Sequence, residues 1–308
     1  MTENYISLLK RLLQSSGMSQ AQLAGRLGIT FAALNRWLNG RARPRPKKIV
    51  AIERLHLELV RYPAYENASM AQNIKAAQKQ KRPGLWKLIA QNEALQDDLL
   101  LEHTYNSTAI EGTTFSKHQT EAVLFSKKIL PDKSLVEHLE VTNHAAVLRK
   151  ILRGDHDLPV SELSIKELHR GLLQGIRFDA GEYSKHHRVV RGVEIALTHP
   201  ADIPEEMARL IRRWKRNRRI TLREIALFHV ELELIHPFGD GNGRVGRLIM
   251  TLQCLQRDYP PVVIENARKA EYYEVLEYAQ RKSEGPFIAF LVEELGETSK
   301  ILKKHRIR

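Results

Sequence analysis

The sequence has one cysteine and no long apolar run, and both shortages limit what the protein can be. The single cysteine, Cys254, excludes an intramolecular disulfide and a zinc site built on several thiolates. No stretch approaches the roughly 18 consecutive apolar residues that a membrane helix needs. Glu3, Lys10 and Arg11 stand where a secretory signal would be apolar. We therefore expect a cytoplasmic protein with no membrane partner.

Acidic residues are also outnumbered, since 36 Asp and Glu stand against 49 Lys and Arg, a formal net charge of +13. The excess is uneven, because residues 1–60 hold ten basic and three acidic side chains. A local basic excess favours a polyanionic partner through counterion release, although most charge runs are solvated surface. At 308 residues, 43% of them apolar, the chain is long enough for one large or two smaller globular domains.

The basic N-terminal region has a helical pattern with short interruptions. Ser19 precedes one apolar repeat, Thr30 is a good N-cap for a second helix, and Gly28 can adopt the positive φ of a tight turn. Over about residues 5–58 this segment resembles the repressor-like helix-turn-helix family. The resemblance implies that the helix from Thr30 to Leu38 enters the major groove of duplex DNA. The implied DNA contacts are Thr30, Asn35, Arg36, Arg41 and Arg43, with Arg45, Lys47 and Lys48 near the backbone.

An alternative for this region is a domain that docks a protein or a second copy of itself. Phe31, Ala32 and Ala33 place apolar groups where sequence-reading helices carry polar side chains. We therefore expect DNA binding with low sequence specificity. Because repressor-like domains commonly bind DNA as dimers, a homodimer is also possible.

The chain divides into four predicted parts. A helix-turn-helix domain over residues 1–60 is followed by a polar linker over 61–84, a larger domain over 85–300 and a basic tail over 301–308. Within the linker, Ala71 to Lys81 reads as a solvent-exposed helix, and Leu85 to Leu101 reads as the first helix of the larger domain.

The strongest chemical signal lies between His236 and Arg247. A capping box at Thr221 and an apolar stripe predict a helix that stops at Pro237, and a second helix begins near Asn242. The start of that second helix offers unpaired N–H groups and the positive end of the helix dipole, which suit phosphates.

Four side chains in this window complete the parts for attack by a hydroxyl on a nucleotide phosphate. Arg244 and Arg247 add two cations, Asp240 offers a hard oxygen ligand for Mg²⁺, and His236 can take a proton near neutral pH. Taken alone, each of these residues also has a purely structural explanation, as part of a turn, a solvated surface charge or a structural histidine. Their occurrence together within twelve residues is what those explanations leave unaccounted for.

The window matches the Fic family signature H-P-F-x-[DE]-G-N-G-R-x-x-R at every fixed position, and the resemblance extends over residues 85–295. It implies an all-α fold with a short β-hairpin flap, and transfer of AMP from ATP to a Ser, Thr or Tyr hydroxyl of a protein. His236 is then the general base and Asp240 holds Mg²⁺. The implied phosphate-binding residues are Gly241, Asn242, Gly243, Arg244 and Arg247.

Two further segments gain meaning from this resemblance. The β-branched stretch from Val189 to Thr198 fits the flap that clamps a target segment, through Val189, Val190, Val193 and Ile195. Ser184 departs from the arginine that many members carry there, which affects target selection. Members that transfer groups with an inverted nucleotide carry lysine at the position of Gly243, so AMP transfer is favoured.

A second motif, Ser107-x-x-x-Glu111-Gly112, matches the family's inhibitory helix, expected near residues 102–112. The resemblance implies that Glu111 pairs with Arg247 and occupies the place of the ATP γ-phosphate, with Ser107 anchoring the helix and Gly112 ending it. Two alternatives stay open: a DNA-binding regulator whose Fic domain is secondary, and a hydrolase that removes AMP.

Overall fold

The computed structural model describes residues 5–61, 69–154, 158–187, 197–281 and 283–307. Within these ranges the chain is built from helices and contains no β-strand, in agreement with the all-α prediction. None of the helices in the same ranges is long and apolar enough to cross a membrane. The expected flap residues Val189, Val190, Val193 and Ile195 lie outside the described residues.

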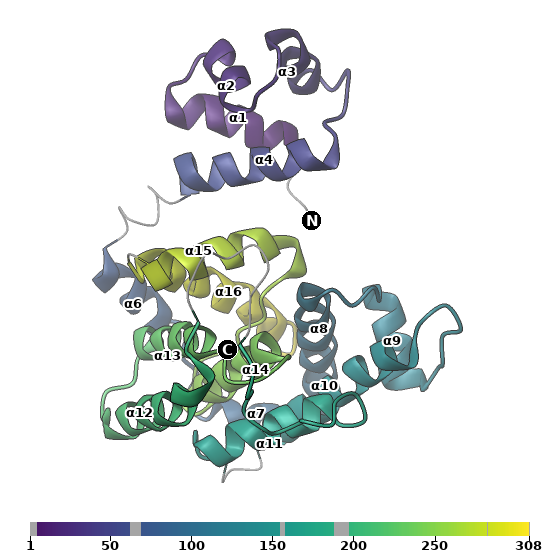
Figure 1. Cartoon of the computed structure of the whole chain (residues 1–308), viewed down its shortest axis with the longest axis vertical. Coiled ribbons are helices and arrows are strands. Elements are labelled where there is room, and N and C mark those ends of the chain that lie inside the picture. Colours follow the sequence, from purple (N-terminus) through teal and green to yellow (C-terminus); the bar gives the residue numbers. More distant parts are fainter. Residues whose placement is uncertain (1–4, 62–68, 155–157, 188–196, 282, 308) are drawn as a thin grey trace.

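The N-terminal helices form a bundle of their own at one end of the molecule (Figure 1). Thr30 caps the third helix as predicted, Ser19 caps the second, and Gly28 has a φ of +59° between them. The bundle closes around a separate apolar core that includes Leu9, Leu34 and Ile52. Its elements are α1 (Tyr5–Ser16), α2 (Gln20–Arg26), α3 (Phe31–Leu38), α4 (Pro46–His56) and the π-helical η1 (Leu57–Arg61).

A larger C-terminal body follows, with one main apolar core and a small separate cluster of Phe115, Val123 and Val141. Its elements are α6 (Met70–Gln78), α7 (Leu85–Ala90), α8 (Glu93–Glu111), α9 (Lys117–Ser126), α10 (Leu135–Arg153), α11 (Glu162–Leu173), η2 (Pro200–Asp202), α12 (Ile203–Arg216), α13 (Leu222–Ile235), α14 (Asn242–Leu255), η3 (Asn266–Arg268), α15 (Lys269–Arg281) and α16 (Gly285–Lys304). All but one of the fourteen residues of α14 are buried, so α14 is the central helix. The elements α8, α11 and α13 pack around it.

Two sequence expectations about the start of this body need correction. The segment expected as one helix from Leu85 to Leu101 is two helices, because the side chain of Asn92 caps the start of α8. The helix expected as solvent-exposed is α6, but one face of α6 packs on α16 and Ala77 is fully buried. Residues 70–84 therefore pack as part of the larger body.

Candidate active site

His236 lies where α13 ends. Thr221 and Glu224 form the predicted capping box at the start of α13, and Pro237 follows His236 directly. His236 itself closes the helix in the left-handed conformation, with φ of +49°, and its N–H bonds the carbonyl oxygen of Leu232 at 2.8 Å. A non-glycine residue held there costs on the order of 1–3 kcal/mol, which the surrounding packing must offset. The fold thus fixes the backbone of the predicted base.

The loop after His236 is braced by Phe238 and Asn242. Phe238 is fully buried, and its ring stacks on His169 of α11 with centroids 3.8 Å apart. The Asn242 side chain accepts from the Phe238 N–H and donates to its carbonyl oxygen, both at 2.9 Å. The amide of Asn242 was expected to bind phosphate, whereas in the structure both of its ends hold the loop closed.

His169 of α11 holds the loop through hydrogen bonds of its ring. Its Nδ1 accepts the Gly181 N–H at 2.7 Å, so its Nε2 carries the proton and donates to the carbonyl oxygen of Asp240 at 3.0 Å. Burial lowers the pKa of His169 to about 4, so the ring is neutral at physiological pH. This fixed tautomer positions the backbone between Asp240 and Gly241, at the start of α14.

The N-terminus of α14 can accept an anion and a hard cation together. Its N-cap is Gly241, with φ of +74°, so the N-cap residue supplies no side chain to bond the first N–H groups of the helix. The carboxylate of Asp240 is 52% exposed, and its Oδ1 accepts the Gly241 N–H at 2.6 Å. Mg²⁺ that bridges phosphates is held by one or two carboxylates together with phosphate and water oxygens, so the exposed Asp240 carboxylate fits that ion, while the helix N–H groups suit the phosphate.

The two motif arginines point to different helices. The Nη1 of Arg244 lies 2.6 Å from Glu140 Oε1 on α10, and its Nη2 lies 3.5 Å from Asp240 Oδ1. The side chain of Arg244 is only 3% exposed. Glu140 lies 104 residues earlier in the chain, and nothing in the sequence motif announces it. The structure therefore adds Glu140 to the site.

Arg247 is held by α8. Its Nε donates to Ser107 Oγ at 3.0 Å, and its Nη2 donates to the Ser107 carbonyl at 2.9 Å and to Glu111 Oε1 at 2.6 Å. The Arg247 side chain is 2% exposed. Burial is the largest single influence and acts against its charge, but the Glu111 carboxylate, Tyr272 and Tyr273 together outweigh burial and raise the pKa of Arg247 above its usual value. Gly112 ends α8 with φ of +109°, directly after Glu111.

Gly243 leaves the space in which this pair forms. A Cβ at Gly243 would collide with Glu111 Oε1 and approach Arg247 Nη1 to 2.9 Å. Nη1 itself has no hydrogen-bond partner within the described part of the chain. A pocket of about 120 Å³ opens here. It is lined by Glu111, Glu233, His236, Gly243, Arg247, Tyr272 and Tyr273, among others.

The family comparisons agree with this geometry. Residues 159–254, from just before α11 to the end of α14, match the Fic/DOC family, and residues 9–55 match a helix-turn-helix family. The chain contains a Fic domain. We use that name below for the C-terminal body, and call the N-terminal bundle the HTH domain.

Proteins named protein adenylyltransferase Fic from Aedes aegypti and Drosophila melanogaster are 30% and 31% identical to this chain, over 70% and 69% of its length. The chain spans only 44% of the length of either relative. A solved structure of a Fic domain-containing signaling protein from Bacteroides thetaiotaomicron has a TM-score of 0.62 at 26% identity, covering 75% of this chain and 98% of that one.

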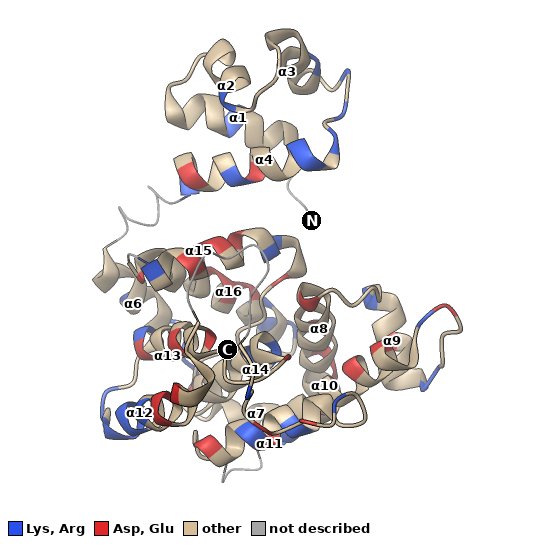
Figure 2. Cartoon of the chain, viewed as in Figure 1, with Lys and Arg blue, Asp and Glu red and all other residues tan. Residues whose placement is uncertain are grey.

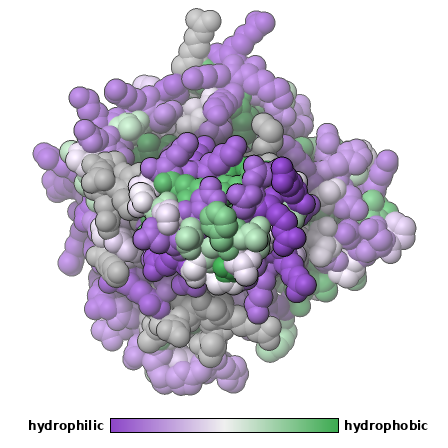
Figure 3. All heavy atoms as spheres, turned by 90° about the horizontal axis from the view of Figure 1, so that it is seen from above, coloured by the Kyte–Doolittle hydropathy of each residue, from purple (hydrophilic) through white to green (hydrophobic). Residues whose placement is uncertain are grey.

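The HTH domain carries an exposed basic edge. Lys and Arg positions occur on α3 and in the loop after it (Figure 2), and Arg36, Arg41 and Arg43 are exposed. Seen from this end, the surface is mostly hydrophilic around a smaller apolar group (Figure 3), and Phe31 is 54% exposed. Lys48 differs from the expectation, because its Nζ donates to the Leu27 carbonyl at 2.6 Å and closes the end of α2.

Two other predicted DNA contacts have partners inside the HTH domain. The Thr30 side chain accepts the Ala33 N–H at 3.2 Å as a helix cap. The amide oxygen of Asn35 accepts from Asn39 Nδ2 at 3.1 Å. Thr30 and Asn35 therefore each have a partner in or directly after α3, whereas Arg36, Arg41 and Arg43 are exposed.

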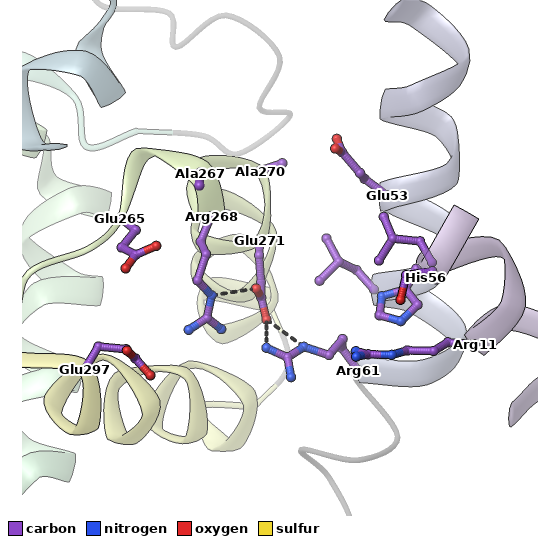
Figure 4. Close-up of a pocket in the computed structure, with 13 residues that line it drawn as sticks. Arg11, Glu53, His56, Arg61, Glu265, Ala267, Arg268, Ala270, Glu271 and Glu297 are labelled. Atoms are coloured by element: carbon purple, nitrogen blue, oxygen red, sulfur yellow. Dashed lines mark hydrogen bonds and ion pairs between the residues drawn. The ribbon is translucent and has the colours of Figure 1, made fainter. Parts of the chain in front are cut away.

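A larger cavity, about 780 Å³, lies between the two domains rather than at the motif. Figure 4 shows Arg61, at the end of η1, reaching Glu271 on α15, with Arg268 on the other side of the same carboxylate. Arg61 also lies 2.9 Å from Glu293 of α16. These ion pairs join the HTH domain to α15, the helix whose Tyr272 and Tyr273 line the small pocket.

Proposed function

We propose that this protein transfers AMP from ATP to a Ser, Thr or Tyr hydroxyl of a target protein, and that α8 inhibits it. The observation that carries the proposal is the buried Arg247, whose charge is met by the Glu111 carboxylate at 2.6 Å, in the pocket that His236 also lines. A buried guanidinium beside a helix N-terminus is a phosphate site, and here a carboxylate from the same chain takes the place of the phosphate. The names of the relatives in Aedes and Drosophila support the same reaction.

The proposed reaction assigns each side chain a step. His236 takes the proton of the target hydroxyl, and the hydroxyl oxygen then forms a bond to the α-phosphorus of ATP. The bond between that phosphorus and the oxygen bridging to the β-phosphate breaks, and pyrophosphate leaves. Helix N–H groups from Gly243 onward and the guanidinium of Arg244 bind the phosphates. Mg²⁺ held by Asp240 would neutralise charge on the phosphates when it is bound.

Inhibition follows from competition for one cation. In this proposal Arg247 must release Glu111 to bind the γ-phosphate, because Glu111 Oε1 already fills the space beside Gly243 and accepts from Arg247 Nη2. ATP that binds without this contact would adopt a pose that is wrong for in-line attack. We propose that Ser107 anchors α8 in the inhibited state through its two bonds to Arg247.

The test compares the parent with Glu111→Gly. Both proteins are incubated with α-labelled ATP and Mg²⁺, and intact masses are measured. We expect the variant, but not the parent, to gain the mass of one AMP. Glu102→Gln is the matched control, because Glu102 lies on the same helix but pairs with Lys117. Absence of AMP on the variant and on added proteins contradicts the proposal, and loss of AMP from a premodified protein favours the hydrolase.

We also propose that residues 1–60 bind duplex DNA, with little sequence discrimination. The exposed Arg36, Arg41 and Arg43 and the helix-turn-helix match support this second function. A homodimer, a cytoplasmic location, and target binding by Val189, Val190, Val193 and Ile195 stay predictions from the sequence. Size exclusion with light scattering tests the dimer.

A further inference from the structure

Glu233 is a largely buried acid beside the proposed base, and the proposed reaction has not used it. It lies on α13, one helical turn before His236, and its side chain is 11% exposed. Its Oε2 is 3.8 Å from His236 Nδ1. Its Oε1 has no hydrogen-bond partner in the described part of the chain. A buried carboxylate with an unused oxygen is costly, so its position beside the base calls for an explanation.

The space for Glu233 depends on Gly246 of α14. A Cβ at Gly246 would lie 2.7 Å from Glu233 Oε1 and 2.8 Å from a ring carbon of His229. The Fic signature leaves this position open, yet α13 approaches α14 so closely here that a Cβ would force the Glu233 carboxylate and the His229 ring to move. The carboxylate is therefore held against α14, on the Nδ1 side of His236.

This placement suits control of the histidine's protons. A carboxylate facing Nδ1 keeps the proton of the neutral ring on that nitrogen, which leaves the lone pair on Nε2 for the target hydroxyl. The same carboxylate stabilises the imidazolium that forms once the hydroxyl proton arrives. The 3.8 Å separation is longer than a hydrogen bond, but such contacts tighten when substrate binds.

We propose that Glu233 is a positioning residue that fixes the tautomer of His236 and stabilises its protonated form. The inference rests on the proposed AMP transfer with His236 as base. Glu233 touches no reacting atom and acts only through the ring of His236.

The charges around Glu233 set the pH range in which it acts. Arg247 faces it from α14, Glu111 from α8, and Tyr272 and Tyr273 belong to the same pocket from α15. Burial raises the pKa of Glu233 to about 7, with Arg247 opposing and Glu111 adding to the increase. Removing Glu111 removes one cause of the increase, so Glu233 is ionised at lower pH in the released enzyme. The test therefore uses the Glu111→Gly background.

The first experiment measures kcat, KM for ATP and the pH–rate profile of Glu111→Gly with and without Glu233→Gln. We expect kcat to fall about 10- to 100-fold, as for other residues that orient a reactive group, with KM for ATP unchanged. The acid limb of the profile should move about 1 pH unit lower, because no carboxylate then favours the imidazolium. Glu231→Gln is the matched control, since Glu231 lies on the same helix and pairs with Arg213.

The second experiment reads the tautomer directly. Long-range ¹H–¹⁵N spectra of the His236 ring, assigned with His236→Ala, should show the proton on Nδ1 in the Glu111→Gly background and a mixture of tautomers when Glu233→Gln is added to it. Gly246→Ala should have the same effect, because the new methyl displaces the carboxylate. Gly296→Ala is the control, since a Cβ at that helical position meets nothing within 4 Å.

The outcomes separate the inference from the proposed function. An unchanged tautomer in Glu233→Gln, or an unchanged kcat and acid limb in an active background, overturns the role of Glu233 and leaves AMP transfer standing. A background that transfers no AMP contradicts the proposed function, while the ring spectra still decide whether Glu233 governs the tautomer of His236.

Discussion

The two domains of this chain hold, in opposite ways, the arginines that we propose bind ligands. In the Fic domain, Arg247 is 2% exposed and bound to Ser107 and Glu111. In the HTH domain, Arg41 and Arg43 are exposed. A buried cation needs a partner of opposite charge, so a ligand that binds it has to displace that partner. A substitution of either member of such a pair therefore changes stability and ligand binding strongly, through one contact. An exposed cation is screened by salt, and each one adds a small, nearly independent increment to the affinity for a polyanion.

The largest effect is expected at His236, where the pocket depends on a single base. In the Glu111→Gly background, His236→Ala should lower AMP transfer by about 10²–10⁴, the usual contribution of a general base. ATP binding, measured by calorimetry, should be retained because the phosphate ligands are intact. Radiolabel transfer at the background rate would show that His236 is not the base.

Two further variants sharpen this prediction. Because His236 has a left-handed backbone, His236→Asn separates loss of the base from strain, since asparagine adopts that conformation more readily than alanine. His118→Ala is the control, because the His118 side chain is 91% exposed on α9. Circular dichroism of all three variants should match the background.

The next effect concerns the Arg247–Glu111 pair, whose two members should respond with opposite signs. Glu111→Gly should raise AMP transfer, whereas Arg247→Ala should lower it, because the second change also removes the γ-phosphate contact. Equal transfer by the parent and Glu111→Gly would make Glu111 an ordinary residue at a helix end. The assay is radiolabel transfer at saturating ATP.

The stabilities of the same variants should also differ. Glu111→Gly leaves a guanidinium that is 2% exposed without its carboxylate, whereas Arg247→Ala leaves a carboxylate that is 28% exposed and can be hydrated. We expect Glu111→Gly to lose about 3 kcal/mol of unfolding free energy and Arg247→Ala less. ATP at about 100 times its Kd should restore about 2.7 kcal/mol to Glu111→Gly. Urea unfolding with and without ATP measures both values, and a larger loss in Arg247→Ala contradicts the argument.

Many helix ends could be predicted from the sequence because their signals are local. Thr30, Gly112 and Thr221 were predicted to begin or end helices, and each does so, because a cap needs only its immediate neighbours. The loop from His236 to Arg247 was readable for the same reason. The break between α7 and α8 was missed although Asn92 is a cap signal, because the apolar repeat continues on both sides of it.

Contacts between residues far apart in the chain could not be predicted from the sequence. Glu140 meets Arg244 across 104 residues, and His169 meets the Asp240 carbonyl across 71. Neither partner lies in a motif, and acids and histidines on helices are common. The docking of α6 was missed for the same reason, since Gln80 accepts from Ser299 across 219 residues. The sequence motif therefore named Arg244 and Arg247 but not the side chains that hold them.

The smallest effect is expected at the exposed edge of the HTH domain. Full-length protein should bind a random-sequence duplex with an affinity that falls steeply as salt rises, because phosphate contacts release counterions. Arg41→Ala and Arg43→Ala should each reduce the slope of log K against log salt by about 0.9, the value for one phosphate contact. Fluorescence anisotropy at several salt concentrations gives these slopes.

The control for this prediction is a charge removed from the same domain at a paired position. Arg26 lies 3.5 Å from Glu58, so Arg26→Ala lowers the net charge by the same amount but takes away a cation that a carboxylate already partly neutralises. If only net charge matters, Arg26→Ala, Arg41→Ala and Arg43→Ala all reduce the slope of log K against log salt by the same amount. The edge formed by Arg41 and Arg43 then has no special role. If that edge contacts the backbone, Arg26→Ala keeps the parental slope and the double variant Arg41→Ala, Arg43→Ala loses about 1.8. Salt-independent binding, or none at low salt, would instead favour a domain that docks a protein, because a screened contact with phosphates cannot be insensitive to salt.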